Sequence, residues 1–198
     1  MTIRRKVIAL SCHAENAMTP KRIMFIRHAE KPAVPGDGKG GGGVQPDGSQ
    51  DSESLTVRGW QRAGALVQFF ARPELKPGVI FASGLGHGSK SKRPVQTVTP
   101  LADLLKTEAV ALVTTHLKDD LQPLMEDVLS RQGPVLVAWE HKLIPALVGL
   151  LPNPPSVPSG WPDDRFDVVW LFDRTDTGWS FSQLPQLLLS GDSANPIS

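Results

Sequence analysis

The chain has 198 residues, of which 40% are hydrophobic and 21% charged, a composition that suits a globular domain and excludes wholesale disorder. The 21 lysines and arginines balance 20 aspartates and glutamates, leaving a net charge of +1. That balance excludes the broad basic surface that binds nucleic acid, so we expect no nucleic-acid partner. A net charge near zero is still compatible with one concentrated basic pocket.

The N-terminal 20 residues are predicted to be a poorly ordered extension, and residues 21–198 a single domain. The apolar run at 7–10 has only four residues, whereas a signal peptide needs roughly 7–15. No apolar stretch is long and unbroken enough for a membrane span, so we expect no membrane association. Cys12 is the only cysteine, which excludes an internal disulfide and favours a reducing compartment. We therefore expect a cytoplasmic protein.

From residue 22 onward, short apolar runs alternate with helical periodicity. Thr56 is a good N-cap for a helix with one apolar face, and the run at 134–139 is apolar throughout, as in a strand buried on both faces. The pattern predicts strands at 22–27, 79–83, 109–114, 134–139, 165–173 and 179–184, and helices at 56–70, 94–106, 119–130 and 143–151. This alternation predicts a three-layer α/β fold with a mainly parallel sheet. The glycine-rich segment 37–54 is expected to be a mobile surface loop.

Charged and histidine side chains follow several of the predicted strands. In sheets of this kind, ligands bind beyond the carboxyl ends of the strands. Arg27 and His28 end the first strand, Arg93 follows the second, and His141 follows the fourth. Guanidinium groups suit phosphate oxygens, and a histidine held among arginines stays neutral and nucleophilic. The sequence therefore predicts a site for phosphoryl transfer through a phosphohistidine.

Four segments in order resemble the motifs of the histidine phosphatase superfamily, also called the phosphoglycerate mutase-like family. They span roughly residues 22–150 and comprise Arg27, His28, Ala29 and Glu30; Leu55, Thr56, Gly59, Gln61 and Ala63; Ser91, Arg93, Gln96 and Thr97; and Glu140 with His141. Alanine replaces the glycine of the family's first signature at position 29, a change found in its small phosphatase branch.

The resemblance implies a phosphoglycerate mutase-like fold and a metal-independent phosphatase without cofactors. It implies that His28 is the phosphorylated nucleophile and that Arg27, Arg93 and His141 form the phosphate pocket. For the general acid it points first to Asp119 and Asp120, near a Leu117-Lys118-Asp119 context, and third to Glu140. Further substrate contacts are expected from Glu30, Ser91 and Lys90.

Two other functions stay open. Residues 84–91 approach the frame of a nucleotide-binding phosphate loop, with Ser89 in place of its second glycine, which suggests an ATPase. A non-catalytic phospho-ligand-binding or scaffold protein with the same fold would also carry the pocket. We favour a phosphatase over a mutase because no insertion is evident that would retain an intermediate. Either a phosphorylated small molecule or a phosphoprotein would suit the site, and the oligomeric state is left open.

Overall fold

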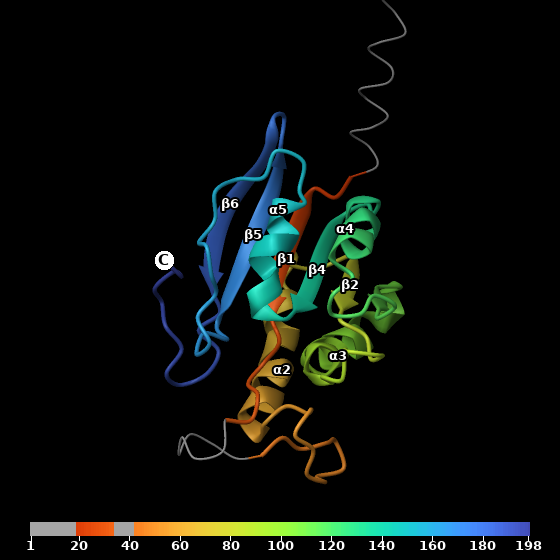
Figure 1. Ribbon diagram of the computed structural model, residues 1–198, viewed down its shortest axis with the longest axis vertical. Coiled ribbons are helices and arrows are strands. Elements are labelled where there is room, and N and C mark those ends of the chain that lie inside the picture. The colour runs from red at the N-terminus through yellow and green to blue at the C-terminus, as the bar shows by residue number, and fades with distance from the viewer. Residues whose placement is uncertain (1–18, 34–41) are drawn as a thin grey trace, which may run out of the picture.

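The computed structural model describes residues 19–33 and 42–198, which form one six-stranded sheet in the order β3-β2-β4-β1-β5-β6 (Figure 1). The predicted extension therefore lies almost entirely outside the described residues, as does the first part of the glycine-rich loop. The strands are β1 (Arg22–Arg27), β2 (Val79–Ala82), β3 (Ala111–Val113), β4 (Pro134–Trp139), β5 (Val168–Thr175) and β6 (Gly178–Pro185). The helices are α2 (Val57–Phe70), α3 (Arg93–Leu105), α4 (Leu121–Leu129) and α5 (Ile144–Gly149).

The first four strands are parallel, which confirms the predicted mainly parallel sheet. β4 lies between β1 and β2, and β3 pairs with the outer side of β2. β5 runs antiparallel to β1 and forms an antiparallel hairpin with β6 at the far edge. An antiparallel edge on a parallel sheet is common, since a hairpin needs only a short turn and no crossover helix.

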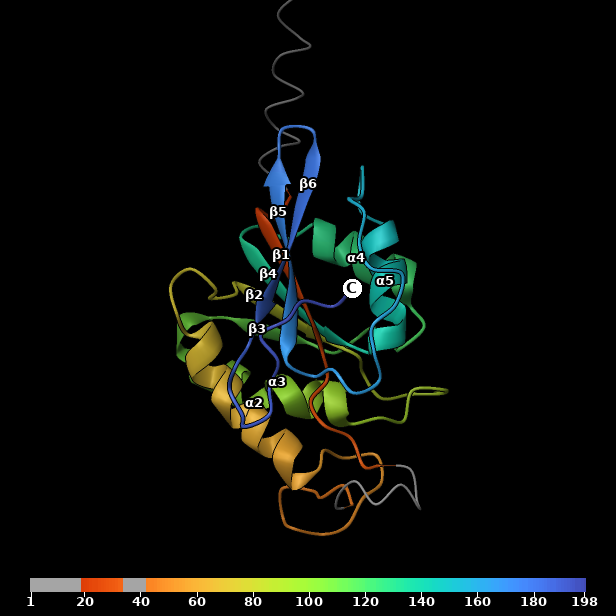
Figure 2. The same cartoon turned by 90° about the vertical axis from the view of Figure 1, so that its left-hand side faces the viewer.

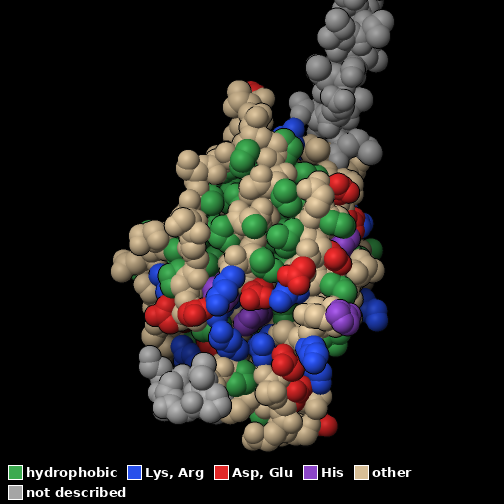
Figure 3. All heavy atoms as spheres, viewed as in Figure 1, with side chains coloured by type: hydrophobic (Ala, Val, Ile, Leu, Met, Phe, Trp, Pro, Cys, Tyr) green, Lys and Arg blue, Asp and Glu red, His purple; other side chains and the backbone are tan. Residues whose placement is uncertain are grey.

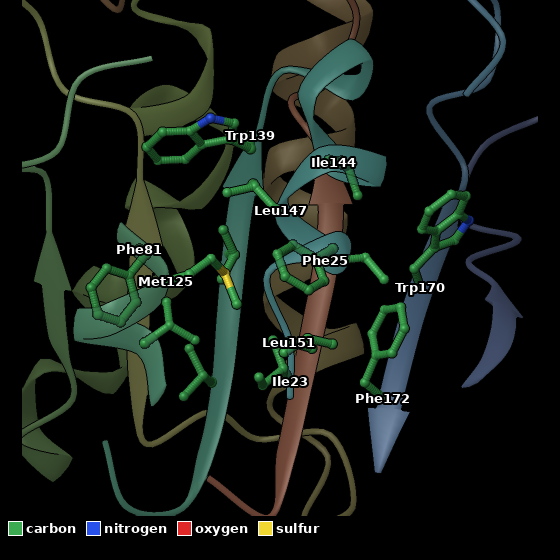
Figure 4. Close-up of a cluster of buried hydrophobic side chains, with 14 of the residues drawn as sticks. Ile23, Phe25, Phe81, Met125, Trp139, Ile144, Leu147, Leu151, Trp170 and Phe172 are labelled. Atoms are coloured by element: carbon green, nitrogen blue, oxygen red, sulfur yellow. The ribbon is translucent and has the colours of Figure 1, made fainter. Parts of the chain in front are cut away.

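Helices cover both faces of the sheet, giving the predicted three layers. Figure 2 shows α2 and α3 on one side of the strands and α4 and α5 on the other. Successive strand residues alternate between two cores because a strand's side chains point to opposite faces. Ile23 and Phe25 pack toward α4 and α5, whereas Met24 and Ile26 pack toward α2 and α3. The first of these cores also buries Trp139 and Trp170 (Figure 4).

Most element boundaries fall close to the predicted ones, and the differences have local causes. Thr56 caps α2 as expected, its Oγ1 accepting a hydrogen bond from the Gly59 amide at 3.1 Å. The strand predicted at 109–114 shortens to Ala111–Val113, because Ala109 adopts a left-handed φ of 60° after a 3₁₀ turn over Lys106–Glu108. The strand predicted at 165–173 begins only at Val168, which leaves residues 161–167 as a loop beside the site.

The described part of the glycine-rich loop, residues 42–54, is held against the helices rather than free. Val44 pairs with Gln50, and the Trp60 indole donates to the Val44 carbonyl at 2.9 Å. Asp51 accepts from Lys92 Nζ at 2.8 Å. The prediction of a mobile loop is wrong for this half, because its polar groups find partners on α2 and at the start of α3. None of the described helices is long and apolar enough to span a membrane.

Candidate active site

A cavity of about 310 Å³ opens at the carboxyl ends of β1, β2 and β4, at the edge where the sequence places the strand-end residues. Its polar lining includes His28, His141, Arg93, Ser91, Glu53 and Glu140, with lysines at 31, 90, 118 and 142. We call it the first cavity. Figure 3 shows basic, acidic and histidine side chains gathered in one band on this part of the surface.

His28 follows β1 directly and is 95% shielded from solvent, with 5% exposed. Its Nδ1 lies 2.8 Å from the Ala29 carbonyl oxygen, which can only accept, so Nδ1 carries the proton. The lone pair is then on Nε2, which forms no hydrogen bond within the described residues. Burial lowers the pKa of His28 to about 3, and the positive charges of Arg27, Arg93 and His141 act in the same direction. At neutral pH His28 is thus an uncharged imidazole with a free nitrogen.

His141 follows β4 and is equally buried. Its Nε2 lies 2.6 Å from Asp163 Oδ1, while its Nδ1 is buried without a hydrogen-bond partner among the described residues. Burial, followed by the charge of Arg27, lowers the pKa of His141 to about 4, although Asp163 opposes that shift. Sequence reasoning missed Asp163, because it sits in a loop 22 residues beyond His141 and belongs to none of the four motifs.

Arg93 and Ser91 line the first cavity as predicted. Arg93 is the first residue of α3; its Nη1 donates to the Ser52 carbonyl at 2.8 Å, and its Nη2 lies 3.6 Å from Glu53. Its Nε and the Ser91 hydroxyl are buried and lack partners in the part of the chain that the structure describes. Buried donors without partners are rare in folded proteins and need an explanation, which a bound anion would supply.

Arg27 lies behind the first cavity, not in its lining. Its guanidinium stacks over Phe166, 3.7 Å from the ring centroid, and its Nη1 donates to the carbonyl oxygens of Pro162, Asp163 and Arg165 at 2.7–3.1 Å. Its Nε and Nη2 have no partner in the described segments. Burial lowers the pKa of Arg27 to about 10, which still leaves it charged at neutral pH.

The carboxylates that line the first cavity are Glu140 and Glu53, whereas Asp119 and Asp120 are not part of its lining. Asp120 accepts a hydrogen bond from the Leu117 amide at 2.8 Å and so closes the turn before α4. The Asp119 side chain is 74% exposed. Of the three expected acids, only Glu140, which was placed third, therefore lines the cavity. Glu53 was missed because its loop was expected to be mobile.

Glu30 also lies elsewhere than expected. Its carboxylate accepts from Arg62, with Nη2 at 2.9 Å, and lies 3.3 Å from Arg58 Nε. It lines a second cavity of about 480 Å³ together with Asp163, Asp192 and several neighbours. We call this the second cavity. An anionic substrate contact by Glu30 has no geometric support, because its charge is already balanced by two arginines.

The loop 84–91 does not have the backbone of a nucleotide-binding phosphate loop. The amides of Gly86 and Ser89 donate to each other's carbonyl oxygens at 2.9 and 3.1 Å, so the loop closes as a small hairpin. Ser89 Oγ donates inward to the Gly84 carbonyl at 2.6 Å. Amides used in this way cannot wrap phosphates. Lys90 does line the first cavity, but α3 starts three residues later, at Arg93.

Several motif residues hold the site together instead of lining it. A Cβ at Gly59 would lie 2.6 Å from the Glu30 carbonyl oxygen, so only glycine allows α2 to approach the segment after β1. Thr97 Oγ1 accepts from the Ala29 amide at 2.8 Å, and Gln96 Oε1 accepts from the Leu55 amide at 2.9 Å. These bonds join α3 to the segments that precede and follow the glycine-rich loop. They fix the backbone on which His28 sits.

Within residues 19–33 and 42–198, no group of three or more histidine, cysteine, aspartate or glutamate side chains is placed to bind a metal ion.

No protein-family model matches the sequence, and no curated protein matches it. The chain is similar to the solved structure of a presumed phosphohistidine phosphatase, SixA, from Agrobacterium tumefaciens, with a TM-score of 0.49 and 19% identity over 83% of this chain and 97% of that one. It is also similar to the product of open reading frame Rv3214 from Mycobacterium tuberculosis (TM-score 0.46, 14% identity, 85% and 98% covered). A third is a presumed alpha-ribazole-5'-P phosphatase from Escherichia coli K-12 (TM-score 0.48, 15% identity, 83% and 96% covered).

Proposed function

We propose that the protein is a phosphatase that hydrolyses phosphomonoesters through a phosphohistidine on His28. One observation carries the proposal: a neutral, buried imidazole stands at the first cavity among donors that lack partners within the described residues. These donors belong to Arg27, Arg93 and Ser91. A bound phosphate would supply their missing acceptors, and the motif resemblance points to the same chemistry.

In the proposed reaction, His28 Nε2 attacks the phosphorus atom in line with the leaving oxygen. The N–P bond forms as the P–O bond to the leaving group breaks, and that oxygen takes a proton from a carboxylic acid. Water then attacks the phosphorus atom of the phosphohistidine and gives a proton to the carboxylate left by the first step. The N–P bond breaks, which releases inorganic phosphate and restores the imidazole and the carboxylic acid. Arginine donors stabilise the charge that spreads over the transferring oxygens, since they are already aimed and need no reorganisation.

We assign the acid role to Glu140. It lines the first cavity next to His141 in the chain, and its side chain is about one-third exposed, at 34%. Glu53 also lines the cavity, but it lies 3.6 Å from Arg93, a residue of the proposed phosphate pocket, whereas the cation nearest to Glu140 is Lys118, at 4.0 Å. Protonated Glu140 is therefore the better donor for a leaving alkoxide, and Glu53 is the natural comparison.

His141 would respond to the bound phosphate. Its Nε2–H donates to Asp163 and its Nδ1 carries a lone pair. A phosphate dianion favours the imidazolium, because an opposite charge nearby stabilises the charged form. Protonated Nδ1 then donates to a phosphate oxygen while Asp163 keeps the ring in place.

The decisive experiment is to incubate the protein with 4-nitrophenyl phosphate in the presence of a chelator and to repeat the assay with His28→Ala. We expect turnover to fall at least about a thousandfold, as for loss of a nucleophile. Quenched reactions should carry acid-labile, base-stable phosphate on His28. Turnover that survives in His28→Ala, or that requires a divalent metal, would refute the proposal.

Binding assays with inorganic phosphate and with Mg-ATP, run beside this assay, separate the alternatives. A scaffold protein would bind inorganic phosphate without forming phospho-His28 and without turnover. A nucleotide-binding ATPase would bind Mg-ATP and lose that binding in Lys90→Ala. Either result would replace the phosphatase assignment.

A further inference from the structure

Hydrogen bonds hold the Arg27 guanidinium group through only one of its three nitrogens. Nη1 donates to the carbonyl oxygens of Pro162, Asp163 and Arg165, so its two hydrogens are shared among three acceptors. Nε and Nη2, which form the other edge of the planar group, are buried and have no partner within the described residues. Two parallel N–H groups on one edge suit two oxygens of a phosphate. The orientation of this edge therefore decides whether Arg27 can bind the substrate.

The ring of Phe166 supplies a constraint that these hydrogen bonds lack. Bonds at Nη1 fix one end of the guanidinium group, but they leave the group free to tilt about that end. The guanidinium carbon of Arg27 lies over the Phe166 ring, 3.7 Å from its centroid, which is a direct cation–π contact. A flat cation that rests on a flat ring cannot tilt far without losing this contact. Phe166 therefore sets the plane in which Nε and Nη2 point.

Phe166 also borders His28, although it does not line the first cavity. The two ring centroids lie 6.4 Å apart with their planes at 49°, which is within the range of an aromatic pair. Phe166 lines the second cavity instead. A substrate in the first cavity would not touch this ring, so any influence of Phe166 on the reaction passes through the side chains that it borders.

The loop that carries Phe166 is fixed at the residues on either side of the ring. Arg165 Nε donates to Asp167 Oδ1 at 2.7 Å, and Arg165 Nη2 donates to the Asn195 carbonyl at 2.8 Å. Asp167 also accepts a hydrogen bond from the Ser193 amide. These bonds tie the loop to the C-terminal segment, whereas Phe166 itself is half-buried and belongs to none of the hydrophobic core clusters. The ring can therefore be replaced without opening the core.

We propose that Phe166 is a positioning residue of the active site, whose ring orients the Arg27 guanidinium so that Nε and Nη2 face the transferring phosphate. This inference rests on the proposed function. One loop then controls Arg27 in two ways, because its carbonyl oxygens hold Nη1 and its aromatic ring sets the plane. Donors that are already aimed need no reorganisation in the transition state, so Phe166 contributes to the rate without touching the substrate.

Two substitutions test the proposal, since Phe166→Leu removes the aromatic face and Phe166→Tyr keeps it. With 4-nitrophenyl phosphate we expect kcat/KM per folded molecule to fall about tenfold in Phe166→Leu and to stay within about twofold of the wild type in Phe166→Tyr. Phe69→Leu is the matched control. Phe69 also carries an arginine over its ring, Arg72 at 4.4 Å, but lines neither cavity, so this variant should keep the wild-type kcat/KM per folded molecule.

A double-mutant cycle with Arg27→Lys shows whether Phe166 acts through Arg27. Lysine keeps the positive charge but has no planar fork to orient. In the Arg27→Lys background, Phe166→Leu should therefore lower kcat/KM by less than about twofold. An equally large loss in both backgrounds would overturn the inference, because Phe166 would then act on His28 or on the fold. Wild-type kcat/KM in Phe166→Leu, or a loss that Phe166→Tyr shares in full, would also overturn it.

Calorimetry with orthophosphate distinguishes a failure of this inference from a failure of the proposed function. If no ester is hydrolysed, the proposed function fails, and the affinity for orthophosphate still reports the orientation of Arg27. The Kd should then rise at least about twofold in Phe166→Leu and stay near the wild-type value in Phe166→Tyr. Equal affinities in all three proteins, or no binding of orthophosphate by the wild type, would refute the role of Phe166.

Discussion

The two cavities differ in how their buried polar groups are paired, although Lys31 contributes to the lining of both. In the second cavity, Arg62 Nη2 lies 2.9 Å from Glu30 and 2.7 Å from Asp192, and its Nη1 donates to Gln186. Asp192 further accepts from the amides of Leu188 and Leu189. In the first cavity, buried donors of Ser91 and Arg93 have no partner within the described residues.

This difference distinguishes the second cavity, whose polar groups bind one another, from the first, whose unpaired donors could bind a ligand. Buried polar groups without partners cost free energy, so a fold keeps them where a ligand supplies the missing bonds. The second cavity is larger, yet Glu30, Arg62 and Asp192 in its lining already satisfy one another. Unpaired donors therefore indicate function better than cavity size does.

The largest effect on stability is expected at Arg62, which pairs with both Glu30 and Asp192 in the second cavity. Arg62→Met would leave Glu30 and Asp192 buried without their shared cation, and we expect a loss of about 3–5 kcal/mol in the free energy of unfolding. Urea denaturation measures the loss, and kcat per folded molecule should stay near wild type. Arg58→Met is the control: its side chain is 45% exposed, so its loss should cost less than about 1 kcal/mol. Equal costs for the two variants would contradict a structural role for Arg62.

In the first cavity the largest effect after His28 belongs to Glu140. Glu140→Gln should lower kcat for an alkyl phosphate roughly a hundredfold, because the leaving alkoxide loses its proton donor. The loss should shrink for 4-nitrophenyl phosphate, whose leaving group needs little protonation. Glu53→Gln and Asp119→Asn are the matched comparisons, and both should lack this dependence on the leaving group. If Glu53→Gln shows it instead, the acid is Glu53.

Asp163 lines the second cavity and contacts the first only through its hydrogen bond to His141, so it should have a smaller effect. It holds His141 by a hydrogen bond and raises its pKa, so Asp163→Asn should lower kcat/KM about tenfold, the worth of one hydrogen bond to a charged group. Without the Asp163 carboxylate the pKa of His141 is lower than in the wild type. If protonated His141 binds the phosphate, the alkaline limb of the kcat profile should therefore move to lower pH in the variant. A merely structural role would leave that limb in place. Asp163→Glu should restore part of the rate.

Lowering the pH should reduce the free energy of unfolding through groups of both cavities, but in different pH ranges. The pKa values of His28 and His141 are lowered to about 3 and about 4 from an unfolded value near 6.5, so the unfolded chain binds protons first. Their stabilising contribution is complete above pH 6.5 and is lost as the pH falls toward 4 and 3. The free energy of unfolding should therefore drop by up to about 1.4 kcal/mol per pH unit for each histidine.

The contribution of the second cavity to stability should be lost only at lower pH. Asp192, whose pKa is lowered to about 2 by Arg62 and two amides despite its burial, loses its contribution below about pH 4. Urea titrations of the wild type and of His28→Asn between pH 7 and 3 measure both ranges. His28→Asn should remove one histidine's share of the slope from about pH 6.5 down to about pH 3, and leave the His141 share above about pH 4 and the Asp192 share below it. An unchanged slope would contradict the lowered pKa of His28.

Local patterns were sufficient for much of the fold. The apolar runs at β1 and β4, the cap at Thr56 and the alternation of strands and helices depend on neighbours within a few residues, so they could be read from the chain. The same patterns placed His28, Arg93 and His141 at one edge, because parallel strands end together. The strand predicted at 109–114 shows where a local pattern failed, because Ala109 adopts a left-handed φ and the strand begins only at Ala111.

The amino-acid sequence by itself thus determined the layered sheet and the residues that meet at its edge, since period and chain order alone decide these. Tertiary structure decided which donors stay unpaired, which carboxylates line the same cavity and what holds the ring of His141. Asp163 reaches His141 across 22 residues, Glu53 comes from a loop that appeared mobile, and Asp120 turns away to bind a backbone amide. Such choices depend on contacts between distant segments and on burial, which no local pattern in the chain encodes.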